Sequence, residues 1–596
     1  MRDRNRRRRI SAFSCHGVAA WFLCALALSV IGCYNRVVLQ EPVVWEVNDR
    51  RPISEPQEET IGQWALWDGT DKMVFYRIGQ LFNLGRSMRD LGAWVGLADP
   101  IEAQNVNAFD EVPNSTWFTN RQFFSRRSEE ELTAGPTTDR GAPDTAGPWT
   151  AIAAKASLGS TPGFVIRDQK NDVYLIKFDP PLYPEMTTAS EMITPRFLHA
   201  AGYNVPEHYL IYFDPAKIRI DPKAKFRGKY HVPRPMQEQD ITAILDRIPH
   251  RPDGTIRAMA SKYLAGVPKG PFLYEGKRPD DPNDRILHEN RRELRGFRIL
   301  AAFVNHTDTK AANALDTYDP ETRYLTHHLI DFSSTLGADN ADPQFPRFGN
   351  EYFFDFGTVG HSTIALGSYV RPWEIPLEMH YPAVGYFESV YFDPPRWRPT
   401  YPNPAFLRMT LRDAYWGAKI VTSFTDEDID AIVHTGRYTD ARAERYVADV
   451  LKARRDKIGR YYFNLINPLD RFTIDTEFDE QVLVFENLAL SRGYAPAPHA
   501  LYRYSISKYV PNRFDTSVIP ETLVQSPKIR LDKAFLEAWG KHTADGRATE
   551  QERPIAAVRI QTSYDDGSHW GKRVVVYLQE HPVTRRMTIV GLERET

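Results

Sequence analysis

The feature that most constrains this chain is a polar loop followed by an apolar strand, within residues 304–337. The loop reads Val304-Asn305-His306-Thr307-Asp308-Thr309-Lys310-Ala311-Ala312-Asn313, and the strand leads into Leu329-Ile330-Asp331-Phe332-Ser333. Before the loop, residues 284–304 repeat apolar side chains at helical spacing, which predicts a helix that ends directly before His306. The fold must therefore present several polar side chains at the ends of a helix and a strand.

These side chains carry the groups that metal-assisted phosphoryl transfer requires. A carboxylate on a tight loop, Asp308, can accept the proton of an attacking hydroxyl, and Lys310 can reach the phosphoryl oxygens. Asn313 and Asp331 offer oxygen ligands of the kind that Mg²⁺ binds. The alternative is a polar loop whose Asp and Asn residues only cap turns. Further candidates upstream favour the first interpretation.

A predicted hairpin upstream supplies candidates for nucleotide binding. A turn that contains Gly159 and Gly163 leads into one strand, and residues 173–178 form the return strand, which contains Lys177. A lysine at this place can pair with the α- and β-phosphates of a nucleotide. The two glycines form an incomplete version of a glycine-rich phosphate loop.

A helix is predicted over residues 187–201, opening with threonine caps. It contains Glu191, the best candidate for a carboxylate that orients Lys177. Pro195 should kink or split this helix, which leaves Glu185 as the alternative.

The order of these features resembles the protein-kinase-like superfamily: Gly turn, strand Lys, helix Glu, long helix, polar loop and metal Asp. The sequence Gly202-Tyr203-Asn204-Val205-Pro206 between a helix and a strand resembles its atypical HipA- and CotH-like branch. The resemblance implies an α+β, bilobal domain over residues 150–467, with a β-rich small lobe and a helical large lobe. It also implies ATP and Mg²⁺ as cofactors.

The resemblance assigns a role to each candidate. Asp308 would be the base, and Lys310 would steady the transferring phosphoryl group. Lys177, with Gly159 and Gly163, would bind the nucleotide, Glu191 would orient Lys177, and Asn313 and Asp331 would hold Mg²⁺. His306 is expected to pack behind the loop. Thr307 replaces the usual arginine and Ser333-Ser334 replaces the usual glycine, so control by activation-loop phosphorylation is not expected.

The N-terminus predicts export. All three cysteines, Cys15, Cys24 and Cys33, lie in the first 33 residues, behind an arginine-rich start and around an apolar run over residues 17–32. The run ends in Val30-Ile31-Gly32-Cys33, which resembles a lipobox. We therefore expect residues 1–33 to be a lipoprotein signal peptide, with Cys33 lipidated and the protein anchored on the periplasmic or outer-membrane side. An uncleaved signal anchor is the alternative, and it places the rest of the chain on the same side.

The remaining chain divides into segments that differ in composition and in hydrophobic pattern. Residues 34–149 are an N-terminal extension with a predicted helix over residues 71–97, an aromatic loop over 107–121 and a linker over 135–148. The aromatic loop is either an ordered loop with Trp117 and Phe118 buried or a clamp on a neighbouring domain. Residues 215–283 suggest an insertion or hinge, and helices are predicted over 425–436 and 439–463.

Residues 468–596 predict a β-rich, sandwich-like domain. Strands are predicted over residues 481–485, 556–562, 573–578 and 587–592, and a helix over 532–539.

The sequence thus predicts an ATP- and Mg²⁺-dependent phosphotransferase of the cell envelope. The acceptor is a hydroxyl of a protein or a small molecule, and residues 338–404 are expected to form the substrate-side surface. A net charge of −2 without a basic patch argues against nucleic acid as a partner. Two alternatives stay open: an inactive kinase-like fold that serves as an envelope scaffold, and transfer of AMP on the same metal site.

Overall fold

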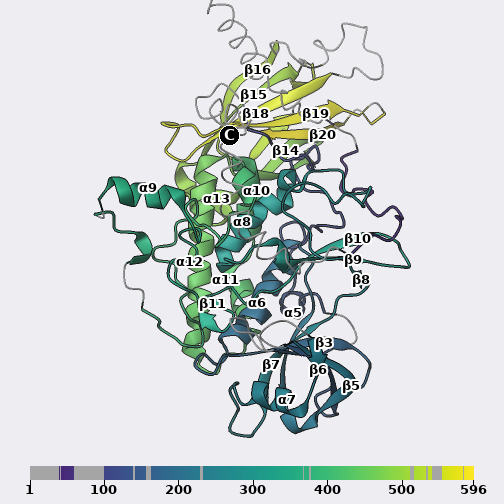
Figure 1. The fold of residues 1–596 in the computed structure, drawn as a ribbon. Coiled ribbons are helices and arrows are strands. Elements are labelled where there is room, and N and C mark those ends of the chain that lie inside the picture. The colour runs from purple at the N-terminus through teal and green to yellow at the C-terminus, as the bar shows by residue number, and fades with distance from the viewer. Residues whose placement is uncertain are drawn as a thin grey trace, which may run out of the picture.

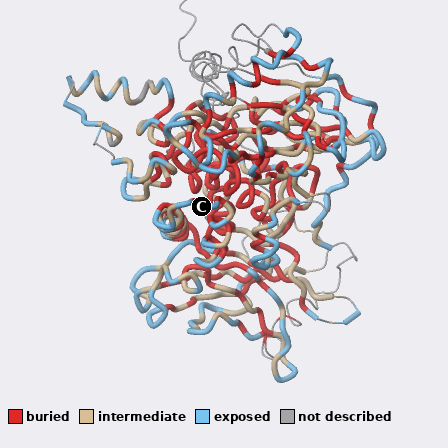
Figure 2. The backbone as a smooth tube through the Cα atoms, turned by 90° about the horizontal axis from the view of Figure 1, so that it is seen from below, coloured by how far each residue is buried: buried red, intermediate tan, exposed pale blue. Residues whose placement is uncertain are grey.

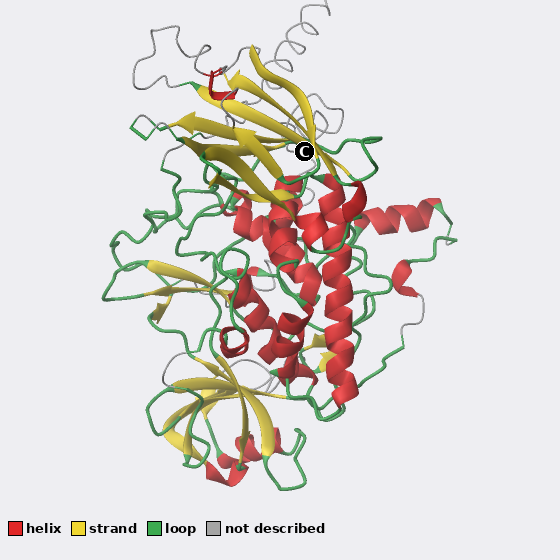
Figure 3. Ribbon diagram, turned by 180° about the vertical axis from the view of Figure 1, so that it is seen from behind, coloured by secondary structure: helices red, strands yellow, loops and turns green. Residues whose placement is uncertain are grey.

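The computed structural model shows a mixed α+β protein with several β-sheets (Figures 1 and 3). It describes residues 39, 42–58, 100–137, 141–155, 163–227, 233–366, 368–374, 378–509, 516–531, 535–537, 539, 554–581, 583–584 and 586–596. The predicted signal peptide with Cys33, the predicted helix over 71–97, Gly159 and half of the predicted helix over 532–539 lie outside the described residues. Among the residues described, no helix has the length and apolar character needed to cross a membrane.

A seven-stranded sheet stands at one end of the molecule (Figure 1). Its order is β4-β7-β3-β2-β1-β5-β6. The strands are β1 (Trp149–Lys155), β2 (Gly163–Arg167), β3 (Val173–Phe178), β4 (His208–Phe213), β5 (Ile218–Arg227), β6 (Pro233–Pro235) and β7 (Ile256–Lys262). Helix α7 (Glu238–Leu245) packs Ile241 and Ile244 into the core of this sheet. The interpretation of residues 215–283 as an insertion or hinge is therefore wrong, because β7 lies inside the sheet between β4 and β3.

The middle of the molecule is helical. It contains α5 (Glu129–Ala134), α6 (Met186–Ala201), α8 (Arg292–Val304), α9 (Phe356–Ile364), α10 (Leu411–Val421), α11 (Asp426–His434) and α12 (Ala441–Leu465). Trp117 and Phe118 are buried in the hydrophobic core that these helices other than α9 share, as expected for an ordered aromatic loop. The capping box predicted at Thr425 and Asp428 begins α11. Helix α8 begins at Arg292, later than the predicted 284.

Two antiparallel sheets form the C-terminal end. One has the order β13-β14-β17 and the other β16-β15-β18-β19-β20. Their strands are β13 (Leu469–Glu477), β14 (Glu480–Asn487), β15 (Leu501–Tyr509), β16 (Thr516–Val524), β17 (Lys528–Leu531), β18 (Ile555–Ser563), β19 (Val574–Glu580) and β20 (Met587–Arg594). One hydrophobic core contains residues of both sheets, such as Leu483 and Val576. The four predicted strands correspond to β14, β18, β19 and β20.

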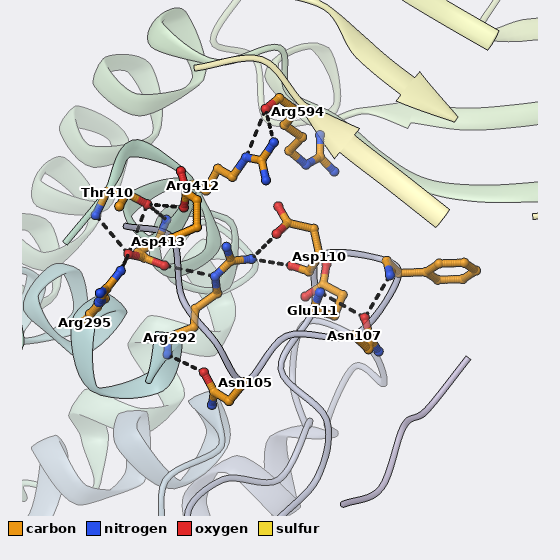
Figure 4. Close-up of polar contacts among 12 residues, drawn as sticks. Asn105, Asn107, Asp110, Glu111, Arg292, Arg295, Thr410, Arg412, Asp413 and Arg594 are labelled. Carbon is orange, nitrogen blue, oxygen red and sulfur yellow. Dashed lines mark hydrogen bonds and ion pairs between the residues drawn. The ribbon is translucent and has the colours of Figure 1, made fainter. Parts of the chain in front are cut away.

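Buried charged residues join this end to the helices (Figure 4). Arg292 on α8 donates to Asp110 Oδ1 at 2.6 Å and to Asp413 Oδ1 on α10 at 3.0 Å. Arg412 on α10 donates through Nε to the carbonyl of Arg594 at 3.0 Å. The N-terminal segment, two helices and the last strand are thus held in one polar network.

A second group of charges continues the network. Lys419 on α10 pairs with Glu111 and lies 3.2 Å from Asp470 on β13. Arg594 Nη2 also donates to Asp470 Oδ2, at 2.8 Å.

Leu39 packs against the cluster of Ala557, Tyr577 and Val590, so the start of the described chain lies on the C-terminal sheet.

Candidate functional site

A small hairpin brings two of the predicted site residues to one end. Strands β9 (Ala314–Tyr318) and β10 (Leu325–Leu329) pair in antiparallel register, with Leu329 opposite Ala314. Asn313 directly precedes β9, and Asp331 follows β10 by two residues. Ile330 N donates to the carbonyl of Asn313 at 3.0 Å, which fixes the two chain ends beside each other. The pairing register therefore places Asn313 and Asp331 close together.

Lys177 on β3 links this hairpin to the seven-stranded sheet. Its Nζ lies 2.5 Å from Glu191 Oε1 on α6 and 2.8 Å from Asp331 Oδ1. The Glu191 side chain is fully buried, whereas that of Asp331 is 40% exposed, so the group is open to solvent on the Asp331 side. Glu185, the alternative partner, instead accepts a hydrogen bond from Thr439 N at 2.9 Å. Glu191 is thus the carboxylate that contacts Lys177.

The charges of this triad stabilise one another. Burial by itself raises the pKa of Asp331, but Lys177 and the hydroxyl of Ser333 outweigh it and bring the pKa well below its usual range. Burial would lower the pKa of Lys177, but Asp331 and Glu191 together raise it. Lys177 is therefore charged, and Asp331 is an anion at neutral pH.

Helix α6 runs through Pro195 without a break, so the predicted split does not occur. A proline has no N–H to donate to the carbonyl four residues earlier, which here belongs to Glu191. That carbonyl lies 2.7 Å from Nδ1 of the buried His208 on β4. The predicted threonine caps are also wrong, because the helix begins after Glu185, which has a left-handed backbone and makes no side-chain cap. Instead, Thr188 N and Oγ1 donate to Asp179, at 2.8 Å each.

Ser333 and Asn340 belong to the site but were not predicted. Asp331 has a left-handed backbone, φ 61°, a conformation uncommon for residues other than glycine. Ser333 Oγ lies 2.6 Å from Asp331 Oδ1 and 2.9 Å from Asn340 Oδ1. Asn340 in turn is tied to α6, because Thr187 Oγ1 donates to its carbonyl at 2.5 Å. Ser333 follows Asp331 by two residues, which was the signal that the sequence offered.

Asp308, Lys310 and Asn313 form a second polar group. Lys310 Nζ lies 2.8 Å from Asp308 Oδ2, and Asn313 Nδ2 donates to the same oxygen at 3.0 Å and to the Asp308 carbonyl at 2.7 Å. The pKa of Lys310 is raised: burial lowers it, but Asp308, with a smaller contribution from Asp331, raises it more. Asn313 donates to Asp308 and is held beside the end of β10 by the hydrogen bond from Ile330 N, so the two polar groups are neighbours.

His306 packs behind this loop, as expected. It is 2% exposed, and its ring lies 6.1 Å from the ring of Phe297 and 5.9 Å from that of Phe332. Burial lowers its pKa, so it is neutral at physiological pH. Gly163 lies opposite Lys177 in the β2–β3 pair.

The fit of the site to Mg²⁺ can be judged from its donor atoms. Within the described ranges, no group of three or more His, Cys, Asp or Glu side chains is arranged to hold a metal. Asn313 and Asp331 offer two oxygen ligands. Two protein ligands suit Mg²⁺, which usually keeps water molecules and takes further oxygens from substrate phosphates.

Comparison of the chain with protein-family models, with curated proteins and with solved structures finds no match. Function is therefore inferred from side-chain geometry alone. Lys177, Glu191 and Asp331 form one group, Asp308, Lys310 and Asn313 form another, and Gly163 lies next to the first. Of the site residues predicted for the nucleotide, Gly159 is the one outside the described residues.

Proposed function

We propose that residues 150–467 form a bilobal, kinase-like domain that transfers phosphate from ATP to a hydroxyl acceptor. The observation that carries this proposal is the position of Lys177. It contacts Glu191 and Asp331, from a helix and from the end of a hairpin, and Asp331 is 154 residues away in the chain. A structural ion pair would need only one carboxylate, whereas a phosphate-binding lysine must be oriented and remain accessible.

Each of these residues then has its own role in the reaction. Lys177 binds phosphate oxygens and is held by Glu191. Asn313 and Asp331 hold Mg²⁺, which supplies charge neutralisation along the phosphates. Asp308 accepts the hydroxyl proton, and the ammonium group of Lys310, 2.8 Å from it, faces the negative charge of the transferring group.

We propose the same cellular setting as the sequence suggests, an exported protein anchored through lipidated Cys33. An enzyme in this setting needs ATP outside the cytoplasm, where it is scarce. The alternative, an inactive scaffold, avoids this need. The presence of all four of Lys177, Asp308, Asn313 and Asp331 favours activity.

Binding of nucleotide separates the two alternatives. Mg-ATP should raise the melting temperature of the parent protein, and Asp331→Asn should abolish that shift because it removes the carboxylate at the metal position. Asp308→Asn should keep the shift but lose phosphoryl transfer, measured with radiolabelled ATP. Glu129→Gln, at an exposed position on α5, is the matched control. A parent protein that shows no shift with Mg-ATP would contradict the proposal and favour the scaffold.

A further inference from the structure

A cavity of about 700 Å³ lies beside the loop that carries Asp308. Its walls come from residues between 345 and 398, including α9, and from Arg454 on α12. The segment around α9 projects from the helical part and is largely exposed, as Figure 2 shows. Asn305, three residues before Asp308, also lines the cavity.

Asn305 connects the cavity to that loop through hydrogen bonds. Its side-chain oxygen accepts a bond from Trp397 Nε1 at 2.8 Å, and Trp397 is itself a cavity residue. Gln344 Nε2 donates to the Asn305 carbonyl at 3.0 Å and lies 3.4 Å from Thr307 Oγ1. A ligand in the cavity therefore touches residues that position the loop.

The cavity combines aromatic rings with nearly balanced charge. Six phenyl and phenol rings line it: Phe345, Phe348, Tyr369, Tyr386, Tyr391 and Phe392. Four carboxylate side chains face three guanidinium groups, so neither a strongly anionic nor a strongly cationic ligand is favoured. Pockets of this type bind through apolar faces and use a few polar groups for orientation.

The polar groups of the lining call for a ligand that donates hydrogen bonds. Glu351 lines the cavity and is 6% exposed, yet among the described residues no donor forms a hydrogen bond to its Oε2. The cations nearest to this oxygen are Arg347 Nε at 3.5 Å and Arg371 Nη1 at 3.9 Å. Arg454 already donates, at 2.6 Å to the carbonyl of Ala302 and at 2.7 Å to that of Glu388. The lining therefore has a buried acceptor to satisfy.

We propose that this cavity binds the acceptor of the phosphoryl group, and that the acceptor is a neutral carbohydrate. A sugar ring lays its C–H face on aromatic rings and offers several hydroxyl donors without net charge. The inference rests on the proposed phosphotransferase function. In the transfer, the bond between the γ-phosphorus and the ADP oxygen breaks, a bond to the sugar oxygen forms, and the hydroxyl proton passes to Asp308.

Three soluble trisaccharides test the charge and the class of the ligand. Calorimetric titration of the full chain should show that maltotriose, which is neutral, binds at least about tenfold more tightly than the cationic glucosamine trimer or anionic trigalacturonate. Glu351→Gln should weaken maltotriose binding about tenfold, because the ligand loses a hydrogen bond to a charged acceptor. Tyr391→Ala should weaken it by loss of stacking, and Phe478→Ala, at an exposed aromatic on the C-terminal end, is its matched control.

These measurements separate failure of the carbohydrate site from failure of the proposed phosphotransferase function. Absence of trisaccharide binding, tighter binding of a charged trisaccharide, or parent-like binding by both cavity variants would overturn the carbohydrate site. Asp331→Asn should bind maltotriose as the parent does while it loses the response to Mg-ATP. If maltotriose binds but Mg-ATP does not, the proposed function fails and the carbohydrate site stands.

Discussion

At the residue scale, Gly163 shows how closely β2 and β3 approach beside Lys177. A Cβ at this position would lie 2.6 Å from the carbonyl oxygen of Ile176, which is backbone and cannot move aside alone. We expect Gly163→Ala to lower the free energy of unfolding by about 1–3 kcal/mol, because the two strands must separate. Urea denaturation measures this change.

The control for this substitution is Gly360→Ala, on α9. No atom of the described residues lies within 4 Å of a Cβ at Gly360, so alanine should leave stability unchanged or raise it slightly. Equal stability of Gly163→Ala and the parent would mean that the strands can adjust and that the glycine is not required there.

At the element scale, helix α6 depends on a residue from strand β4. Because Pro195 cannot donate to the carbonyl of Glu191, His208 takes that role from β4. Burial lowers the pKa of His208 to about 3, so the ring is neutral, with its Nδ1 proton available, at physiological pH. The helix therefore remains continuous and carries Glu191 to Lys177.

A double-mutant cycle tests this exchange of donors. His208→Ala should lower the free energy of unfolding by about 1–3 kcal/mol, because it leaves a buried carbonyl unpaired. Pro195→Ala in the His208→Ala background should recover part of this loss, since the backbone N–H of the introduced alanine can donate to the Glu191 carbonyl. In the parent background, Pro195→Ala should change the free energy of unfolding by less than it does in the His208→Ala background. Additive effects of the two substitutions would contradict the exchange.

Periodicity predicted the elements with one buried face and missed those without it. The strand of Lys177 and four C-terminal strands alternate clearly, and each appears in the structure. The helix before His306 was also predicted, from the spacing of its apolar residues, although all of its residues are buried. Strand β7 was missed because its first five residues are all buried, which erases the period of two. Asn340 was missed because only the fold brings it to Ser333 beside Asp331.

At the scale of the whole molecule, Glu111 lies where the N-terminal segment, α10 and β13 meet. Burial raises its pKa to about 7, with Lys419 lowering it and Asp470 raising it. In the unfolded chain this carboxyl titrates near 4.5. Between these values the folded state holds a proton that the unfolded state releases, so Glu111 makes the free energy of unfolding fall as pH rises.

We expect Glu111→Gln to remove that contribution. The slope of the unfolding free energy against pH should become more positive by about 1 kcal/mol per pH unit between pH 5 and 6.5. Urea denaturation at several pH values measures it, with the exposed Glu238→Gln as control. An unchanged slope would mean that Glu111 is ionised in the folded protein throughout this interval.

The contact of Leu39 with the C-terminal sheet would set the orientation of the protein on a membrane if Cys33 carries the proposed lipid. Five residues lie between Cys33 and Leu39, and the six Cα–Cα steps of an extended chain across them reach about 20 Å. An acyl chain on Cys33 would hold the C-terminal sheets within that reach of the bilayer. The seven-stranded sheet, at the opposite end in Figure 1, would then point away from the lipid.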